Sequence, residues 1–151
     1  MSAWPYAALF AFISICIGGT VADAKDKTPA PKNAYIYFHS PLNGATVPQR
    51  FTVRFGLRGM GVAPAGIERA NTGHHHLLID VDLPDLNQPL PNDPNHLHLG
   101  NGQTEIRLSL PAGPHTLQLV LGDHDHVPHN PPIVSKKISI RVRAGDVASS
   151  P

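Results

Sequence analysis

Cysteine is almost absent from this 151-residue chain, which has a single one, Cys16, inside an N-terminal apolar run. A domain that follows this run contains no disulfide, no zinc–thiolate site and no cysteine nucleophile. Charged residues are also scarce, at 15% against roughly 25% in a typical soluble protein. The longest basic run is the pair at 136–137, so the sequence carries no nucleic-acid-binding footprint and we expect no nucleic-acid partner.

The usual catalytic motifs are missing as well. Glutamate occurs only at Glu68 and Glu105, so no paired-carboxylate hydrolase is visible, and neither Gly-x-Ser-x-Gly nor a phosphate-binding loop occurs. These absences favour a protein that is not an enzyme. Proline, in contrast, is abundant, with 16 residues, about twice the usual share of roughly 5%. Long amphipathic helices are therefore not expected.

The N-terminus has the pattern of a signal peptide. Residues 4–19 are mostly apolar, and Ala22-Asp23-Ala24 gives a small-x-small cleavage site. We expect a signal peptide at 1–24, a polar linker at 25–33, one domain at 34–143 and a C-terminal tail at 144–151, with the mature protein periplasmic or secreted. An uncleaved anchor and lipoprotein processing at Cys16 are alternatives. The apolar run is shorter than the roughly 20 residues of a membrane span, so no stable span is expected after processing.

Alternating apolar and polar residues predict an all-β domain, an immunoglobulin-like antiparallel β-sandwich of six to eight strands with no helix longer than two turns. The predicted strands are 34–39, 51–57, 74–83, 104–110, 115–121 and 133–143, and residues 58–73 and 84–103 are predicted loops. The predicted core is Phe51, Val53, Phe55, Ile106, Leu108, Leu110, Leu117, Leu119, Leu121, Ile138, Ile140 and Val142. The segments SPLNGATV and LPAGPHTLQLVLGD resemble the opening and the later corner of bacterial immunoglobulin-like domains. In that corner His115 takes the place of a structural tyrosine, so we expect a structural role for it.

Histidine is the residue that stands out, with ten in the chain and none before residue 39. Three segments contain His-x-His: 74–76, 96–98 and 124–126. Residues i and i+2 of a strand point to the same face, so each pair can direct two imidazoles at one metal ion. His75 has the opposite parity, shared with Leu77 and Ile79, and is expected to be buried, hydrogen-bonded and not a ligand.

The histidine pattern predicts a transition-metal site, with copper or zinc as the ion. The predicted ligands are His74, His76, His124 and His126, with His96, His98 and His129 in reserve, and Asp80, Asp123 and Asp125 are predicted to orient them. The loop at 84–103 could form a lid over the site, and Met60 is expected to pack rather than bind copper. The alternative is a metal-free network of hydrogen bonds between histidines and aspartates that fixes the loops.

The motifs GMGVAPAG, GHHHLLID, HLHLGNGQTE and HTLQLVLGDHDHVPHNPPIVSKKISI resemble those of an uncharacterised family of exported bacterial domains rich in histidine. Some members carry the label rod shape-determining protein or ATPase, which has no support here because the chain has no nucleotide-binding loop. The resemblance spans roughly residues 34–142 and implies where the site lies, without implying an activity. The residues within its motifs are Gly73, His74, His75, His76, Asp80, His96, His98, Gly122, Asp123, His124, Asp125, His126, Pro128 and His129.

The sequence therefore predicts an exported domain that binds copper or zinc as a carrier, storage or sensor protein. Two alternatives stay open: a metal-free structural or interaction module, and a metal-dependent enzyme with an open coordination position. The protein partner and the oligomeric state are not determined by the sequence.

Overall fold

The computed structural model describes residues 27–145, so the expected signal peptide with Cys16 and most of the C-terminal tail lie outside the described residues. Within 27–145 the regular structure is all β, and no helix of the length and hydropathy of a membrane span occurs there. The strands are β1 (Tyr35–Ser40), β2 (Thr46–Val47), β3 (Arg50–Arg58), β4 (Gly61–Val62), β5 (Thr72–Ile79), β6 (His96–Leu99), β7 (Glu105–Ser109), β8 (Gly113–Gly122) and β9 (Ile138–Val142).

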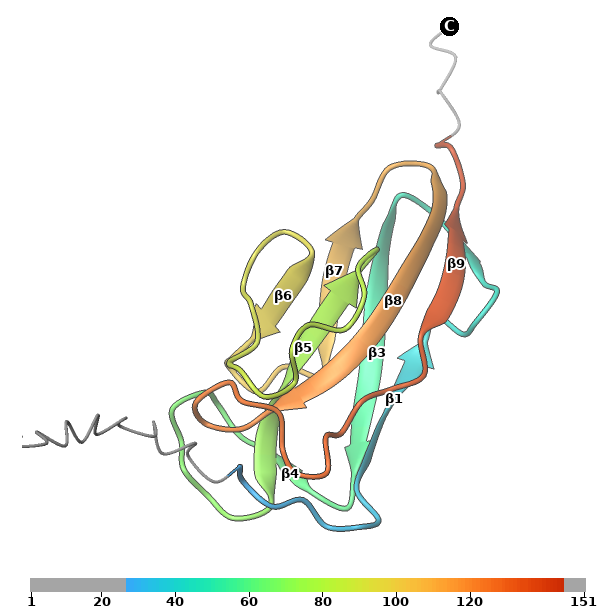
Figure 1. Cartoon of the computed structure of the whole chain (residues 1–151). Coiled ribbons are helices and arrows are strands. Elements are labelled where there is room, and N and C mark those ends of the chain that lie inside the picture. Colours follow the sequence, from blue (N-terminus) through green and yellow to red (C-terminus); the bar gives the residue numbers. More distant parts are fainter. Residues whose placement is uncertain (1–26, 146–151) are drawn as a thin grey trace, which may run out of the picture.

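The strands form two sheets that pack face to face. One sheet has the order β1-β3-β7 and is antiparallel. The other has the order β2-β9-β8-β5-β4, and β6 pairs with the edge of β5 that faces away from β8. Figure 1 shows β5, β8 and β9 in front of β1, β3 and β7. The predicted all-β sandwich is thus confirmed.

The core lies between the two sheets and is built by alternation along the strands. From the three-stranded sheet come Phe51, Val53 and Phe55, and β8 contributes Leu117, Leu119 and Leu121 from the other side. Burial of these side chains removes apolar surface from water, which is the main stabilising contribution to such a fold. Of the predicted core set, all members are buried except Ile106 and Leu110, which are partly buried and pack against it.

The outer face of the six-stranded sheet is covered too, so β5 is buried on both sides. Leu78 of β5 and Val120 of β8 contact Leu90, which lies in the long connection between β5 and β6. A strand covered on both faces is apolar throughout rather than alternating. This explains why β5, with the sequence TGHHHLLI, is buried from its second residue to its last. Histidine side chains in β5 are therefore in the protein interior whichever face they occupy.

Three details of the predicted strands differ from the structure. The segment 96–99, predicted as loop, is strand β6, and the two-residue strands β2 and β4 raise the strand count to nine within the described residues. The strand predicted at 74–83 ends at Ile79, because Asp80 has a left-handed backbone with φ 57°. The strand predicted at 133–143 begins at Ile138, and before it only Val134 forms an isolated bridge, to Val120.

Candidate metal centre

The first two residues of the site come from β5. His74 and His76 are two positions apart, so both point to the outer face of the six-stranded sheet. Their exposed fractions are 0% and 1%. The Nε2 atoms of the two rings are 3.0 Å apart. The strand thus holds two imidazoles side by side in a buried position.

The third residue comes from β6. The antiparallel register places His98 directly across from His76, on the same face of the sheet. Its ring lies over Gly100, where an added Cβ would overlap the imidazole. His98 is half-buried, so this side of the site reaches the protein surface.

The fourth ring belongs to the turn after β8. The strand ends at Gly122, opposite His74, and a Cβ on Gly122 would come within 3.0 Å of the His76 Nε2 atom. The Asp123 carboxylate then accepts hydrogen bonds from the backbone N–H groups of Asp125 and Val127, at 2.9 and 3.0 Å. This turn holds His126 in a left-handed backbone with φ 68°, a conformation that is uncommon outside glycine.

These four imidazoles form one cluster, which we call the histidine cluster: His74, His76, His98 and His126. Their ring centroids lie between 4.7 and 5.9 Å apart in every pairing. Four imidazoles bound tetrahedrally at about 2.0–2.1 Å would have their centroids roughly 5 Å apart. Donor atoms of three of them, His74, His76 and His98, all lie within 4.8 Å of one another. The arrangement is close to that of a metal site with three or four imidazole ligands.

Burial keeps the strand histidines neutral. It lowers the pKa of His74 to about 4, with a further lowering from the charge of His126. Burial, and then the neighbouring His74, lowers the pKa of His76 to about 2. The pKa of His98 is lowered as well, by burial and then by His126. Neutral imidazole is the form that binds a metal ion, so the cluster is prepared for a ligand role at neutral pH.

Several ring nitrogens of the cluster lack a hydrogen-bond partner among the described residues. They are Nδ1 of His74, Nδ1 of His76 and Nε2 of His98, all buried. An unpaired buried polar atom destabilises a fold by about 1–3 kcal/mol. One cation can bind one nitrogen of each ring, so it would pair either these nitrogens or the facing Nε2 atoms of His74 and His76, and not both sets.

The other predicted ligands lie elsewhere. His124 is 3.4 Å from the Asp125 carboxylate, and His96, across from Leu78 in the register, is 2.9 Å from Asp93. His129 is fully buried, and its Nε2 is 3.2 Å from the carbonyl oxygen of Thr72. The structure therefore joins His126 and His98 to the β5 pair, rather than His126 and His124.

The aspartates predicted to orient the ligands mainly organise the backbone. The Asp80 carboxylate accepts a hydrogen bond from the Thr116 N–H at 2.7 Å and is 2.6 Å from Nδ1 of His115. Asp123 shapes the turn described above and also accepts from the Thr28 hydroxyl at 2.7 Å. The negative charge of Asp123 raises the pKa of His74 and so offsets part of the lowering that burial causes. Asp123 thus acts on the cluster through its charge as well as through the turn.

Two further histidines behave as structural residues. His115 bonds back to the chain, with its Nε2 2.9 Å from the Pro111 carbonyl oxygen. Burial lowers the pKa of His115, but the bonds to Asp80 and Pro111 outweigh that effect and raise it overall. His75 lies on the core side of β5 with its ring 4.6 Å from that of Phe55, and burial lowers its pKa to about 4. Among residues 27–145 its ring nitrogens have no partner with full hydrogen-bond geometry, and a weaker interaction with the Gln103 backbone opposes part of the lowering of its pKa.

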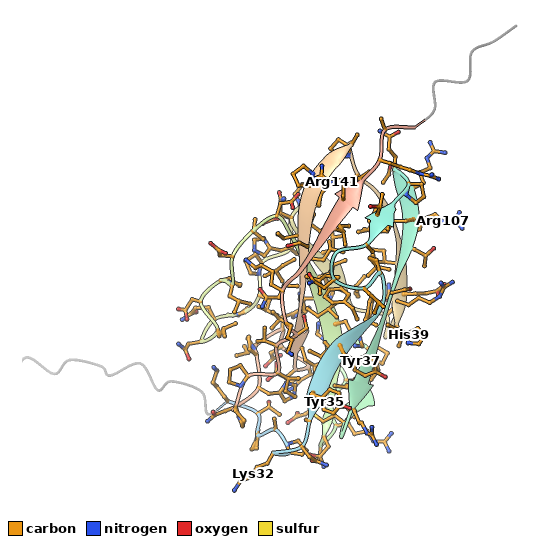
Figure 2. All side chains as sticks on the ribbon, turned by 90° about the vertical axis from the view of Figure 1, so that its right-hand side faces the viewer. Lys32, Tyr35, Tyr37, His39, Arg107 and Arg141 are labelled. Carbon is orange, nitrogen blue, oxygen red and sulfur yellow. The ribbon has the colours of Figure 1, made fainter. Side chains whose placement is uncertain are left out.

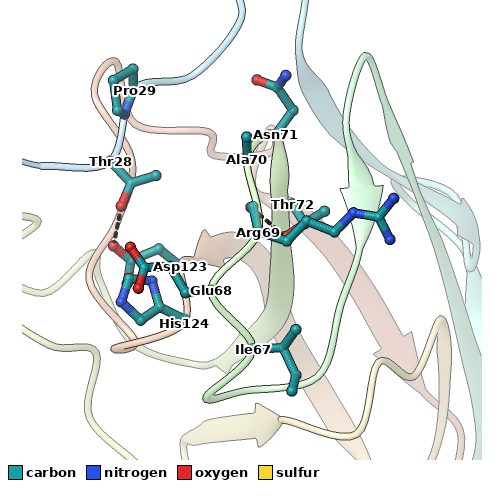
Figure 3. A pocket seen from close by; sticks show the side chains of 10 residues that line it. All are labelled: Thr28, Pro29, Ile67, Glu68, Arg69, Ala70, Asn71, Thr72, Asp123 and His124. Atoms are coloured by element: carbon teal, nitrogen blue, oxygen red, sulfur yellow. Dashed lines mark hydrogen bonds between the residues drawn. The ribbon is translucent and has the colours of Figure 1, made fainter.

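A pocket of about 310 Å³ lies close to the turn after β8. Figure 3 shows the side chains that line it, with Thr28 bonded to Asp123 and His124 beside them. The remaining lining comes from the loop at 67–72 and Pro29. No residue of the histidine cluster lines this pocket, so the cluster does not open into it.

The signal for β6 and for His98 was present in the sequence. The four residues His-Leu-His-Leu at 96–99 alternate with period two, as in a strand with one apolar face. The prolines and asparagines around them suggested a loop instead. Both His124 and His126 were predicted as ligands, and the left-handed turn that brings only His126 to the cluster is a feature that no periodicity reveals.

The fold and the site together define an all-β sandwich with a histidine cluster on the outer face of one sheet. A family model described as a domain of unknown function, DUF4399, matches residues 53–143. The match spans more than half of the chain, and the protein belongs to this family.

Solved structures show more distant likeness. The endo-β-1,4-mannanase from Thermotoga petrophila is 17% identical, with a TM-score of 0.44, over 76% of this chain and 20% of that chain. The chain thus spans about a fifth of the length of the mannanase. The fibronectin(III)-like modules of Clostridium thermocellum CbhA are 12% identical, with a TM-score of 0.35, over 72% of this chain and 95% of theirs. No curated protein matches the chain.

Proposed function

We propose that this protein is an exported domain that binds one copper or zinc ion through the histidine cluster and acts as a carrier, storage or sensor protein. The observation that carries the proposal is the convergence of donor atoms of His74, His76 and His98 within 4.8 Å. His126, whose ring is 4.7 Å from that of His98, is the fourth ligand or the group that closes the site.

The chemistry of the donor set supports copper or zinc. All the converging groups are imidazoles, which suit zinc, copper, nickel and iron, whereas magnesium and calcium prefer oxygen. Met60, the one sulfur-containing side chain among the described residues, packs against the core. The proposed site therefore has nitrogen ligands alone. Among the ions that imidazole binds, copper and zinc are the leading ones for an exported protein.

The sequence of the first 24 residues supports export, as does a mature domain without cysteine. Exported proteins meet metal ions outside the cytoplasm, where a histidine site is not exposed to competing thiols. The two half-buried rings, His98 and His126, give the site a side that faces solvent. An ion could thus enter and leave without unfolding of the sandwich, which a carrier or sensor requires.

A metal-dependent enzyme is the second candidate. Three histidines with an open fourth position are typical of catalytic zinc, and the cluster meets that description if His126 does not bind. The pocket near His124 is lined by none of the cluster residues. A substrate in that pocket would not reach the ion, so this pocket does not support the enzyme.

The proposal is tested by titration of the mature, tag-free domain with Zn(II) and with Cu(II). We expect one ion per chain, and a melting temperature that rises with the ion because only the native state binds it. The variant His74→Ala/His98→Ala should lose both effects. The matched control His39→Ala/His96→Ala removes two histidines outside the cluster and should keep them.

A metal-free network is the alternative outcome. The 3.0 Å separation of the His74 and His76 Nε2 atoms also fits a hydrogen bond between two neutral rings. If neither ion binds the native domain more tightly than the double variant, the metal proposal is wrong and the network takes its place.

A further inference from the structure

The outer face of the three-stranded sheet is strongly basic. In β3, with the sequence RFTVRFGLR, the inward positions are buried and Arg50, Arg54 and Arg58 are exposed on the opposite face. Strand β7 adds Arg107, which lies across from Thr52. The face has one carboxylate, Glu105, bonded to Arg54 at 2.8 Å. Within residues 27–145, no ion pair joins the other three arginines to an acid.

Two tyrosines of β1 stand beside these arginines on the same face. Tyr35 and Tyr37 are 47% and 43% exposed, and their rings are 5.7 Å apart. Tyr37 lies over Gly56 of β3, where a Cβ would come to 2.5 Å from its Cζ atom. Glycine at 56 thus lets the ring lie against the sheet with its other side free. Arg58 donates to the Tyr35 hydroxyl at 3.4 Å.

In Figure 2 the labels of Tyr35, Tyr37, His39 and Arg107 follow one another from the lower part of the molecule to its right-hand edge. We call this surface the Arg/Tyr face. We infer that the Arg/Tyr face binds an acidic polysaccharide, with arginines pairing to its carboxylate or sulfate groups and the tyrosine rings contacting the faces of its sugars. Guanidinium groups bind such oxyanions through two parallel hydrogen bonds, and flat aromatic rings offer apolar area with a polar edge.

The spacing of the arginines favours a polymer over a small anion. Successive arginines of β3 are four residues apart, which corresponds to about 13 Å along a strand. One small anion can contact neighbouring arginines, such as Arg107 and its diagonal neighbour Arg50, but it does not reach all four at once. A chain with an acidic group on each repeat can contact several, and its charge complements a face with four arginines and one glutamate.

A membrane surface fits this face less well. Among the described residues, the other large exposed apolar side chains are Leu42, Ile67 and Leu83, and all three lie outside the three-stranded sheet. Of these three, Leu42 adjoins the face, since it lines a pocket of about 420 Å³ together with Tyr35 and Tyr37. One aliphatic side chain gives little apolar area for insertion into lipid. Single-stranded nucleic acid also combines phosphates with rings that stack, so it is included as an arm of the test.

The inference is independent of the metal site. The histidine cluster lies on the outer face of the six-stranded sheet, and the core separates that sheet from the Arg/Tyr face. Substitutions on one face leave the other intact, so failure of one proposal is distinguishable from failure of the other.

The test is electrophoresis of residues 25–151 in native gels that contain polygalacturonate, an acidic polysaccharide, or dextran, a neutral one. We expect retardation by polygalacturonate that weakens with added NaCl, and none by dextran. The variant Arg50→Gln/Arg107→Gln should bind roughly tenfold more weakly through the loss of two charged donors. The variant Tyr37→Ala, with an unchanged melting temperature, should also bind more weakly.

The matched control is Arg141→Gln/Arg143→Gln, which makes the same charge change at exposed positions at and after the end of β9. It should bind as the unsubstituted protein does. An equal loss in the control, or no loss in Arg50→Gln/Arg107→Gln, would overturn the inference. Tighter binding to oligothymidylate or to phosphatidylglycerol vesicles than to polygalacturonate would also overturn it, in favour of those partners.

Discussion

At the scale of single residues, the backbone of His126 is the most informative feature of the site. Its φ of 68° lies in the left-handed region, where a side chain is normally avoided. Conformations of this kind persist when surrounding contacts hold them, and they gather at functional sites. Here the hydrogen bonds of Asp123 hold the turn, and the result is an imidazole directed at His74 and His98.

Substitution of His126 separates the backbone effect from the ligand effect. Glycine tolerates positive φ and alanine does not, so His126→Gly should be more stable than His126→Ala by roughly 1 kcal/mol. Both variants lack the imidazole and should bind the metal ion more weakly to the same extent. Chemical denaturation gives the first comparison and metal titration the second. Equal stability of the two variants would show that the turn relaxes without strain.

The buried histidines also predict a dependence of stability on pH. An unfolded histidine takes up a proton near pH 6.5, whereas the native pKa values of His74 and His76 are lowered to about 4 and about 2. Between pH 6.5 and 4 the unfolded state therefore binds more protons than the native state, and the native state loses stability as the pH falls. Thermal unfolding of the metal-free protein should show a falling melting temperature across this window.

The same lowered pKa values affect metal binding. Protons compete with the ion only where the ligand nitrogens take them up, so affinity should persist below pH 6.5, the value at which exposed histidines begin to lose metal. Titrations at pH 7 and pH 5.5 measure this. A loss of affinity that follows an ordinary histidine titration would contradict the burial of the two β5 rings.

At the scale of elements, β6 decides the composition of the site. It was predicted as part of a loop, because proline and asparagine surround it, yet its pairing with β5 places His98 across from His76. The pair on β5 itself follows from strand periodicity and was predicted from the sequence. The positions of His98 and His126 depend on strand pairing and on a turn, which are long-range and backbone features that alternation does not encode.

Glycine at position 100 leaves room for the ring of His98, the ligand that we propose on β6. A Cβ there would overlap the His98 ring, so Gly100→Ala should displace that imidazole and weaken metal binding while the sandwich stays folded. Gly61→Ala is the control, since a Cβ at 61 meets nothing nearer than 3.4 Å. Circular dichroism and metal titration of both variants measure the effect. Unchanged affinity in Gly100→Ala would place His98 outside the ligand set.

At the scale of the whole molecule, the sandwich fixes two independent surfaces on opposite sides of one core. The period-two pattern was sufficient to predict the fold class and most of the core, because burial between two sheets imposes that pattern directly. The period-two pattern did not predict that the connection between β5 and β6 covers the outer face of β5, where Leu90 packs on Leu78 and Val120. That cover comes from irregular segments, and it is what buries the histidines.

The core itself gives a stability prediction. Leu119 is fully buried between the sheets, so Leu119→Ala should lower the free energy of unfolding by roughly 2–5 kcal/mol through lost burial and a cavity. Ser109→Ala, on the exposed side of β7, should change it by less than about 0.5 kcal/mol. Urea unfolding of both variants checks the assignment of the two faces.

The central claim is that one transition-metal ion binds among the β5 and β6 histidines. Crystals of residues 25–151 grown with Zn(II) or Cu(II), and measured at the absorption edge of the metal, test it most directly. The account predicts one anomalous peak about 2.0–2.1 Å from a nitrogen of each of His74, His76 and His98, with His126 at or next to the fourth position. A peak at His124, His129 or the surface, with none in the histidine cluster, would contradict it.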